Sequence, residues 1–186
     1  MTRRFLAALL LAALSVAAPA QMRKREALPP VPPEAATVDA IVAALYASVS
    51  HTPDGLPDFE TLRNIFLPVG MLIPPKKPSE DIFTTLDPDG FAERVKKSIA
   101  ERKQKGESAG FVEKEIGRRS DCFGNVCQIF SAYEGRYLAA DEKPFVRGIN
   151  SIQLVRDGRR WWIASVAWDV ETATNPIPAA YLPAAK

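Results

Sequence analysis

Two tandem β-hairpin patterns in residues 111–171 constrain the fold of this chain more than any other feature. The first hairpin turns at Gly124-Asn125, and the second turns at Asp157-Gly158. Gly, Asn and Asp accept the backbone angles of tight hairpin turns, and the flanking segments carry the β-branched and aromatic residues typical of strands. The pattern therefore predicts four consecutive antiparallel strands.

Three segments with apolar residues at helical spacing precede these strands, and the first two follow the N-cap residues Thr37 and Asp58. We expect helices over residues 38–49, 59–66 and 91–103. The apolar segment 69–73 is either a short strand or a plug between helices. Helices followed by a long sheet indicate the α+β class. We expect a curved four-stranded antiparallel sheet, plus the short extra strand, wrapped around three N-terminal helices as a cone-shaped roll.

The N-terminal segment has the pattern of a secretory signal peptide. Arg3 and Arg4 precede an apolar run that ends in Ala18-Pro19-Ala20, so we expect export and cleavage after Ala20. The alternative is a membrane anchor, but the run is shorter than the roughly 20 residues that span a bilayer. The predicted organisation is a signal peptide over 1–20, a disordered Pro-rich leader over 21–36, one domain over 37–171 and a Pro/Ala-rich tail over 172–186.

The charge balance argues against nucleic acid as a partner. The chain has 24 Lys and Arg against 22 Asp and Glu, and two of the arginines lie in the predicted signal peptide. The mature chain would be neutral, whereas proteins that bind nucleic acid usually have a basic excess. No phosphate-binding glycine loop and no cluster of Cys and His ligands is present, so we predict neither a cofactor nor a metal site. No later segment is long and apolar enough to predict a membrane span.

The two cysteines flank the first hairpin turn. If Gly124 and Asn125 form the turn, Cys122 lies opposite Cys127 at a non-hydrogen-bonded position, where the Cβ atoms of paired strands come closest. This spacing suits a cross-strand disulfide, which an oxidising compartment would preserve. The alternative is two unpaired small residues.

Three residues are candidates for acid–base chemistry. Counting back from the first turn places Glu115 opposite Glu134, and facing carboxylates in an enclosed site raise the pKa of one member. The alternative is a bulge that shifts the register, or an outer face on which both groups are solvated. His51, the sole histidine, is the third candidate, although a single histidine in a loop is more often simply exposed.

The ligand-binding candidates are aromatic and polar residues that could line a pocket at the open end of the roll. They are Tyr46, Tyr133, Asn150, Trp161, Trp162 and Trp168. Strict alternation along the last strand puts Trp161 on one face and Trp162 and Trp168 on the other. The alternative, and the more common role of a tryptophan, is packing in the core or in a dimer interface.

The order of these elements resembles the nuclear transport factor 2-like superfamily, also called the cystatin-like α+β roll. Segments 123–126, 131–134, 147–154 and 161–163 look like the strand motifs of its small bacterial members, and the resemblance covers roughly residues 38–169. The superfamily includes ketosteroid isomerases, scytalone dehydratase and scaffold proteins without catalysis, so the resemblance implies a fold and not an activity. The acid–base triplet of ketosteroid isomerase-like members has no counterpart at matching positions here.

Three functional hypotheses follow from the sequence. The leading one is an exported, non-catalytic protein that binds a small apolar ligand or a protein partner through the cone or the sheet. The second is a cofactor-free isomerase, lyase or hydrolase that works by carboxylate acid–base chemistry. The third is a structural module that forms a homodimer through the outer face of the sheet.

Overall fold

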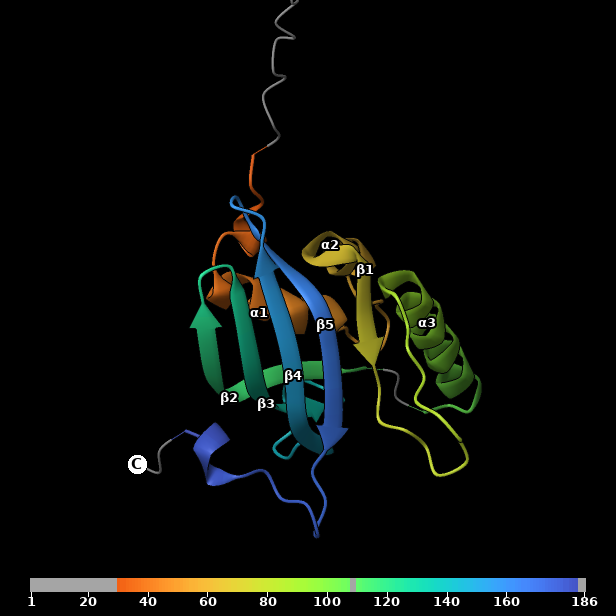
Figure 1. The fold of residues 1–186 in the computed structure, drawn as a ribbon. Coiled ribbons are helices and arrows are strands. Elements are labelled where there is room, and N and C mark those ends of the chain that lie inside the picture. The colour runs from red at the N-terminus through yellow and green to blue at the C-terminus, as the bar shows by residue number, and fades with distance from the viewer. Residues whose placement is uncertain (1–29, 108–109, 184–186) are drawn as a thin grey trace, which may run out of the picture. The chain divides into compact units, whose positions relative to one another are not determined.

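The computed structural model describes residues 30–107 and 110–183 (Figure 1). The predicted signal peptide over 1–20 and most of the predicted leader lie outside the described residues. The end of that leader belongs to the domain, contrary to our prediction of disorder up to residue 36. Pro33–Ala35 forms a short 3-10 helix, and Ala35 is fully buried.

The three predicted helices are present, and each begins at a residue whose side chain caps it. Thr37 caps α1 (Val38–Val49), Asp58 caps α2 (Phe59–Ile65) and Asp87 caps α3 (Pro88–Gln104) by accepting a hydrogen bond from a backbone N–H of the first turn. The third helix begins three residues before its predicted start because Pro88 occupies the first helical position, where its fixed φ angle is favourable.

The sheet has five strands in the order β1-β5-β4-β3-β2. The strands are β1 (Phe66–Ile73), β2 (Val112–Phe123), β3 (Val126–Arg136), β4 (Val146–Arg156) and β5 (Trp161–Val170). The four predicted strands pair antiparallel, but β1 pairs parallel with β5, so the sheet is mixed. Segment 69–73, for which a strand and a plug were both considered, is therefore part of the strand β1. This strand starts at Phe66, a residue that the helical spacing had assigned to the preceding helix.

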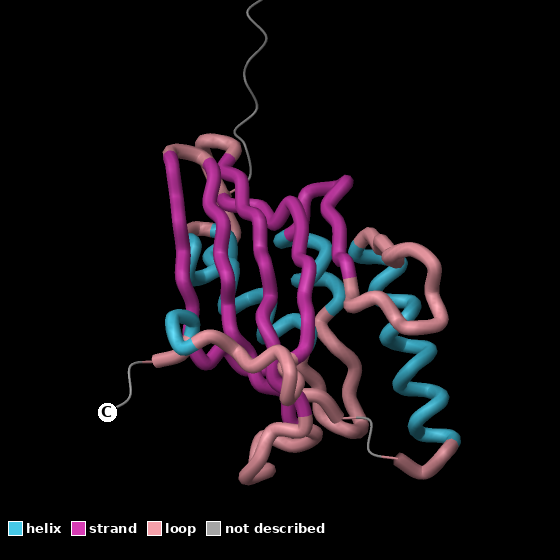
Figure 2. Tube along the Cα trace, turned by 60° about the horizontal axis from the view of Figure 1, so that its bottom comes forward, coloured by secondary structure: helices cyan, strands magenta, loops and turns pink. Residues whose placement is uncertain are grey.

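All three α-helices of the described residues lie on one face of the sheet, where the core forms (Figures 1 and 2). Fully buried side chains from the helices meet fully buried side chains from the inner face of the sheet, among them Ile41, Leu62, Ile129, Ile152 and Ile163. No helix in the described residues is both long and apolar enough to cross a membrane.

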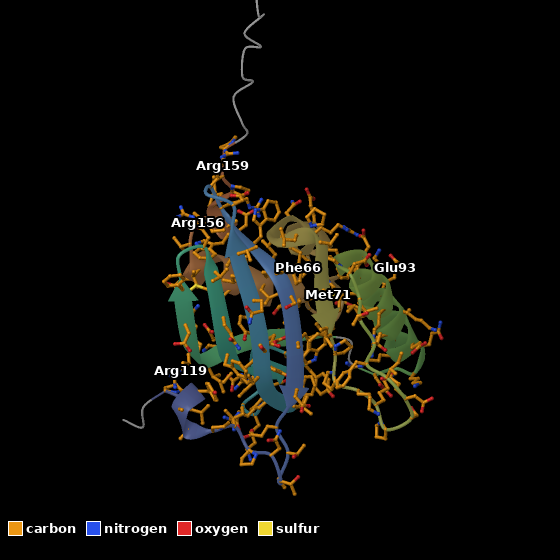
Figure 3. The ribbon with its side chains drawn as sticks, in the orientation of Figure 1. Phe66, Met71, Glu93, Arg119, Arg156 and Arg159 are labelled. Carbon is orange, nitrogen blue, oxygen red and sulfur yellow. A yellow bond between two sulfur atoms is a disulfide. The ribbon has the colours of Figure 1, made fainter. Side chains whose placement is uncertain are left out.

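The first hairpin has the predicted register next to its turn. Phe123 pairs with Val126 and Cys122 pairs with Cys127, and Gly124 has the positive φ of 56° that such a turn requires. The two sulfur atoms form a disulfide, which confirms the predicted bond (Figure 3).

The C-terminal segment after β5 crosses the outer face of the sheet, the face opposite the helices (Figure 2). The ring of Tyr181 stacks on Phe130 of β3 with 5.6 Å between the ring centroids, and Ile177 is buried. The carboxylate of Glu171 accepts a hydrogen bond from the backbone N–H of Ile177 and also pairs with Arg147. Part of the predicted tail is thus packed against the domain.

Gly117 of β2 is the residue that lets this segment approach. A Cβ atom added to Gly117 would lie 2.4 Å from the carbonyl oxygen of Tyr181, closer than atoms can pack. We expect Gly117→Ala to destabilise the fold by about 1–3 kcal/mol, as overpacking does, and to release residues 172–183 to proteolysis. Chemical denaturation and limited proteolysis measure both effects. Ser120→Ala, at an exposed position of the same strand, is the control, and equal stability of the two variants would contradict the packing of this segment.

Candidate functional site

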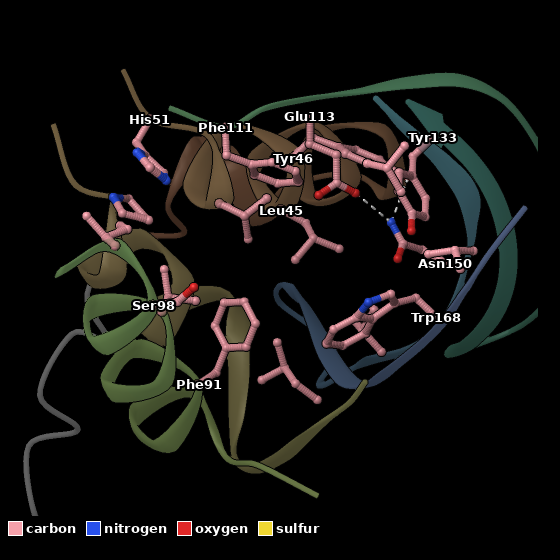
Figure 4. Close-up of a pocket in the computed structure, with 18 of the residues that line it drawn as sticks. Leu45, Tyr46, His51, Phe91, Ser98, Phe111, Glu113, Tyr133, Asn150 and Trp168 are labelled. Carbon is pink, nitrogen blue, oxygen red and sulfur yellow. Dashed lines mark hydrogen bonds between the residues drawn. The ribbon is translucent and has the colours of Figure 1, made fainter. Parts of the chain in front are cut away.

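A cavity of 350 Å³ lies between the helices and the inner face of the sheet (Figure 4). This volume falls within the range of small-molecule sites in proteins. Most of its wall is apolar, and the apolar residues come from α1, β1, α3, β4, β5 and the connecting segments. They are Leu45, Val49, Pro57, Leu72, Phe91, Val95, Ile99, Phe111, Val146, Val166, Trp168 and Val170.

Four polar side chains gather at one end of the cavity: Glu113, Asn150, Tyr46 and Tyr133 (Figure 4). The amide nitrogen of Asn150 donates to the Glu113 carboxylate at 3.1 Å and to the Tyr46 hydroxyl oxygen at 3.2 Å. Both N–H groups of the Asn150 amide are therefore engaged, and its carbonyl oxygen remains as an acceptor. The amide joins a carboxyl group of the cavity to a tyrosine of α1.

Behind this cluster a chain of hydrogen bonds leads away from the cavity to a charged group. Ser131 donates its hydroxyl proton to Glu115, so Tyr46, whose oxygen lies 2.7 Å from that of Ser131, must donate to Ser131. The Glu115 carboxylate is also 3.4 Å from Arg118, which forms an ion pair with Asp39 at 2.9 Å. The charge of Glu115 therefore orients the protons of Ser131 and Tyr46. The Nη1 atom of Arg118 is buried and has no hydrogen-bond partner among the described residues.

Burial raises the pKa of Glu113 from its ordinary value of 4.5 to about 7, and the hydrogen bond from Asn150 opposes this shift only in part. Burial also raises the pKa of Tyr46 and of Tyr133, so both tyrosines are neutral hydroxyl groups at physiological pH. Near neutral pH, Glu113 is present in both its protonated and its ionised form. The protonated form can donate a hydrogen bond to a ligand in the cavity, and the ionised form can accept one from it.

The predicted pairing of Glu115 with Glu134 is wrong. A one-residue bulge at Ile116 shifts the register, so Glu115 lies opposite Tyr133 and Lys114 lies opposite Glu134. Glu115 bonds to Ser131 on the inner side, whereas Glu134 pairs with Arg136. Neither carboxylate lines the cavity. The alternative expectation, a bulge that shifts the register, is therefore correct.

The same bulge turns Glu113 inward, and sequence reasoning did not select this residue. Its partner on β3 is Gly135, whereas an unbroken count from the turn would place Glu113 opposite Arg136. Cys122, beyond the bulge, shares the inner face with the buried Cys127. Without the extra residue, strict alternation would place Glu113 on the outer face. No signal in the sequence marks the bulge itself, although Gly117 beside it is a residue that often accompanies bulges.

The three tryptophans are also arranged differently from the prediction. A second bulge, at Ala164 of β5, puts Trp161 and Trp168 on the same, inner side, where both pack against the core. Trp168 lines the cavity and packs edge-on against Phe91 with 6.3 Å between ring centroids. Trp162 lies on the other face, where its indole N–H donates to Asp157. Trp161 and Trp162 do not line the cavity.

His51 lies at the end of the cavity away from Asn150, near Ser98 of α3 (Figure 4). Its backbone pairs with that of Phe111 in an isolated bridge, and its Nδ1 atom is 3.0 Å from the carbonyl oxygen of Thr52. Of the candidates chosen from the sequence, the cavity therefore brings together Tyr46, His51, Tyr133, Asn150 and Trp168.

Comparison with solved structures supports this architecture. The chain is similar to a protein of unknown function with a cystatin-like fold from Nostoc punctiforme, with a TM-score of 0.51, 11% identity, and coverage of 73% of this chain and 90% of that one. It is also similar to a putative calcium/calmodulin-dependent protein kinase type II association domain from Thiobacillus denitrificans, with a TM-score of 0.52, 11% identity, and coverage of 78% and 100%. The chain has the cystatin-like, nuclear transport factor 2-like fold.

The resemblance inferred from the strand segments is thereby confirmed at the level of the fold. An NTF2-like protein of unknown function from Shewanella baltica also matches, with a TM-score of 0.46, 15% identity, and coverage of 73% of this chain and 94% of that one. No protein-family model matches the sequence. No curated protein matches it either. At these identities the shared fold implies no shared activity.

The raised pKa of Glu113 predicts a measurable dependence of stability on pH. Between about pH 4.5 and 7 the folded chain keeps a proton on Glu113 that the unfolded chain releases, so the free energy of unfolding falls as pH rises through this window. The loss is on the order of 3 kcal/mol. We expect Glu113→Gln to remove this part of the slope in denaturation curves measured across the window. Glu101→Gln, an exposed change on α3, should keep it, and identical slopes in wild type and Glu113→Gln would contradict the shift.

Proposed function

We propose that this protein binds a small, largely apolar ligand in the cavity. The observation that carries the proposal is the combination of an apolar wall with one compact group of hydrogen-bonding side chains at one end. Ligand sites in proteins have this composition, because apolar area supplies the free energy of binding and a few polar atoms fix the orientation.

The polar end of the cavity supports a specific ligand group there. Asn150 offers a carbonyl oxygen as an acceptor, and Glu113 offers a proton when it is neutral. Tyr133 adds a neutral hydroxyl at the same end (Figure 4). A hydroxyl or carbonyl oxygen of a ligand would find both donors and acceptors. A ligand that lacks any polar atom would leave the Asn150 carbonyl oxygen, the proton of neutral Glu113 and the Tyr133 hydroxyl without hydrogen-bond partners, at a cost in free energy.

The proposal is tested with N-phenyl-1-naphthylamine, a neutral dye whose fluorescence increases in apolar surroundings. We expect saturable binding to the wild type and at least roughly tenfold weaker binding to Val95→Phe, because the larger side chain fills space that the dye needs. Val126→Phe makes the same change at an exposed position on β3 and should bind like the wild type. Equal binding by Val95→Phe and Val126→Phe would mean that the dye does not enter the cavity.

Acid–base catalysis is the second candidate function, and the pKa of about 7 for Glu113 favours it. Ionised Glu113 could remove a proton from a carbon beside a ligand carbonyl and return it to another carbon, as in a cofactor-free isomerase. The developing oxyanion needs a donor. Asn150 already uses both N–H groups and Tyr46 donates to Ser131, so Tyr133 is the hydroxyl that remains for this role.

This second function predicts protein-dependent exchange of α-hydrogens in an apolar ketone such as cyclohexanone dissolved in deuterated buffer. NMR would follow loss of the α-hydrogen signal. We expect Glu113→Gln to abolish the exchange and Tyr133→Phe to slow it by about 10²-fold or more. Exchange at the same rate with wild type and Glu113→Gln would exclude Glu113 as the base and leave ligand binding as the function.

Export and a homodimer through the outer face stay predictions from the sequence. The disulfide between Cys122 and Cys127 supports an oxidising compartment. N-terminal sequencing of the protein recovered from its source cells would test cleavage after Ala20.

For the dimer, the outer face offers less surface than the sequence suggested, because residues after β5 cover part of β2 and β3.

A further inference from the structure

The C-terminal end of α3 brings a cation to the cavity. Arg102 lies in the last turn of the helix and lines the cavity together with Ser98, one turn earlier. Within the described residues, Arg102 is the sole arginine or lysine in the cavity wall. Its side chain is 29% exposed, so the guanidinium is partly withdrawn from bulk water while it remains accessible.

Aromatic rings hold this guanidinium in place. Its central carbon lies 4.9 Å from the centroid of the Tyr137 ring, a cation–π contact. Tyr137 stacks on Phe145 with 4.0 Å between centroids, and Phe145 packs against Phe111 of the cavity wall at 6.1 Å. A stacked guanidinium is pre-organised to bind an anion with two parallel hydrogen bonds.

Arg102 has one acidic partner among the described residues, Glu107, and this ion pair is weak enough for a ligand anion to replace it. Glu107 lies 3.7 Å away with more than half of its side chain exposed. Exposed pairs at such distances add little stability, so a ligand anion can replace or share this contact. The ion pair with Glu107 therefore does not account for why an arginine faces the cavity.

The two ends of the cavity favour ligand groups of different charge. Glu113, Asn150 and Tyr133 form one end, while Ser98 and His51 lie at the other (Figure 4). A carboxylate bound beside Glu113 would repel the ionised form of that group. An anion is therefore favoured at the Arg102 end and a neutral oxygen at the Glu113 end, with the apolar wall between them.

We infer that the ligand is an amphipathic monocarboxylate, whose carboxylate pairs with Arg102 and whose apolar body extends along α3 toward Phe91 and Trp168. This inference rests on the proposed ligand-binding function and specifies its ligand class. Phe91 and Arg102 are eleven residues apart, which corresponds to roughly 16 Å along the helix, and both residues line the cavity. A medium-length hydrocarbon chain that ends in a carboxylate suits a span of that length.

The test compares decanoate with decanol as competitors of bound N-phenyl-1-naphthylamine at neutral pH, because the two share one chain and differ in charge. We expect the wild type to bind decanoate more tightly than decanol. Arg102→Gln should weaken decanoate binding by roughly tenfold and change decanol binding by less than about twofold. Arg102→Lys, which keeps the charge and loses the planar fork, should retain part of the preference for decanoate.

Lys103→Gln is the matched control, because it removes a neighbouring exposed charge that does not line the cavity, and it should leave both affinities unchanged. Equal weakening of decanoate and decanol in Arg102→Gln would show a purely structural role for Arg102 and overturn the inference. Dye and decanol binding with no effect of Arg102→Gln on decanoate would overturn it as well, while the proposed function would stand. Failure of the dye and decanol to bind the wild type would overturn the proposed function itself.

Discussion

A single extra residue in β2 decides which face of the sheet carries Glu113. Successive side chains of a strand alternate between faces, so the bulge at Ile116 exchanges the inner and outer sets of residues along the rest of the strand. With the bulge, Glu113 and Glu115 face the helices. Without it, both would face the side that the C-terminal segment covers, and the cavity would lose its carboxyl group.

The two carboxylates that the bulge turns inward have different surroundings and different roles. Glu115 has Arg118 and the Ser131 hydroxyl as partners, so its charge is compensated and anchors the hydrogen bonds that pass through Tyr46. Among the described residues, the carboxylate of Glu113 has no cation beside it and accepts a hydrogen bond from the Asn150 amide, so burial dominates and its pKa rises. Glu115, with its ion pair, stabilises the hydrogen-bonded network. Glu113, which has no ion pair within the described part of the chain, remains available for a ligand.

Strand pairing close to a hairpin turn was predictable from the sequence. Strand pairing far from the turn was not, because one bulge shifts the register of every residue beyond it. The register at Cys122 and Cys127 was predicted because the turn lies only two residues away. Nine residues farther along β2, one unseen bulge was enough to misplace Glu113. The bulge in β5 misplaced the tryptophans for the same reason. Tyr46, Tyr133 and Asn150 line the cavity, because α1 is continuous and β3 and β4 pair without a bulge. That these residues contact a ligand stays a prediction.

The most direct test of this account is the titration of Glu113 itself, followed through the chemical shift of its side-chain carboxyl carbon by NMR. The account predicts a midpoint near pH 7, because burial in the cavity outweighs the hydrogen bond from Asn150. A midpoint near the ordinary value of 4.5 would contradict it. Such a result would mean that Glu113 is solvated and that the bulge does not place a protonatable carboxyl group in an apolar cavity.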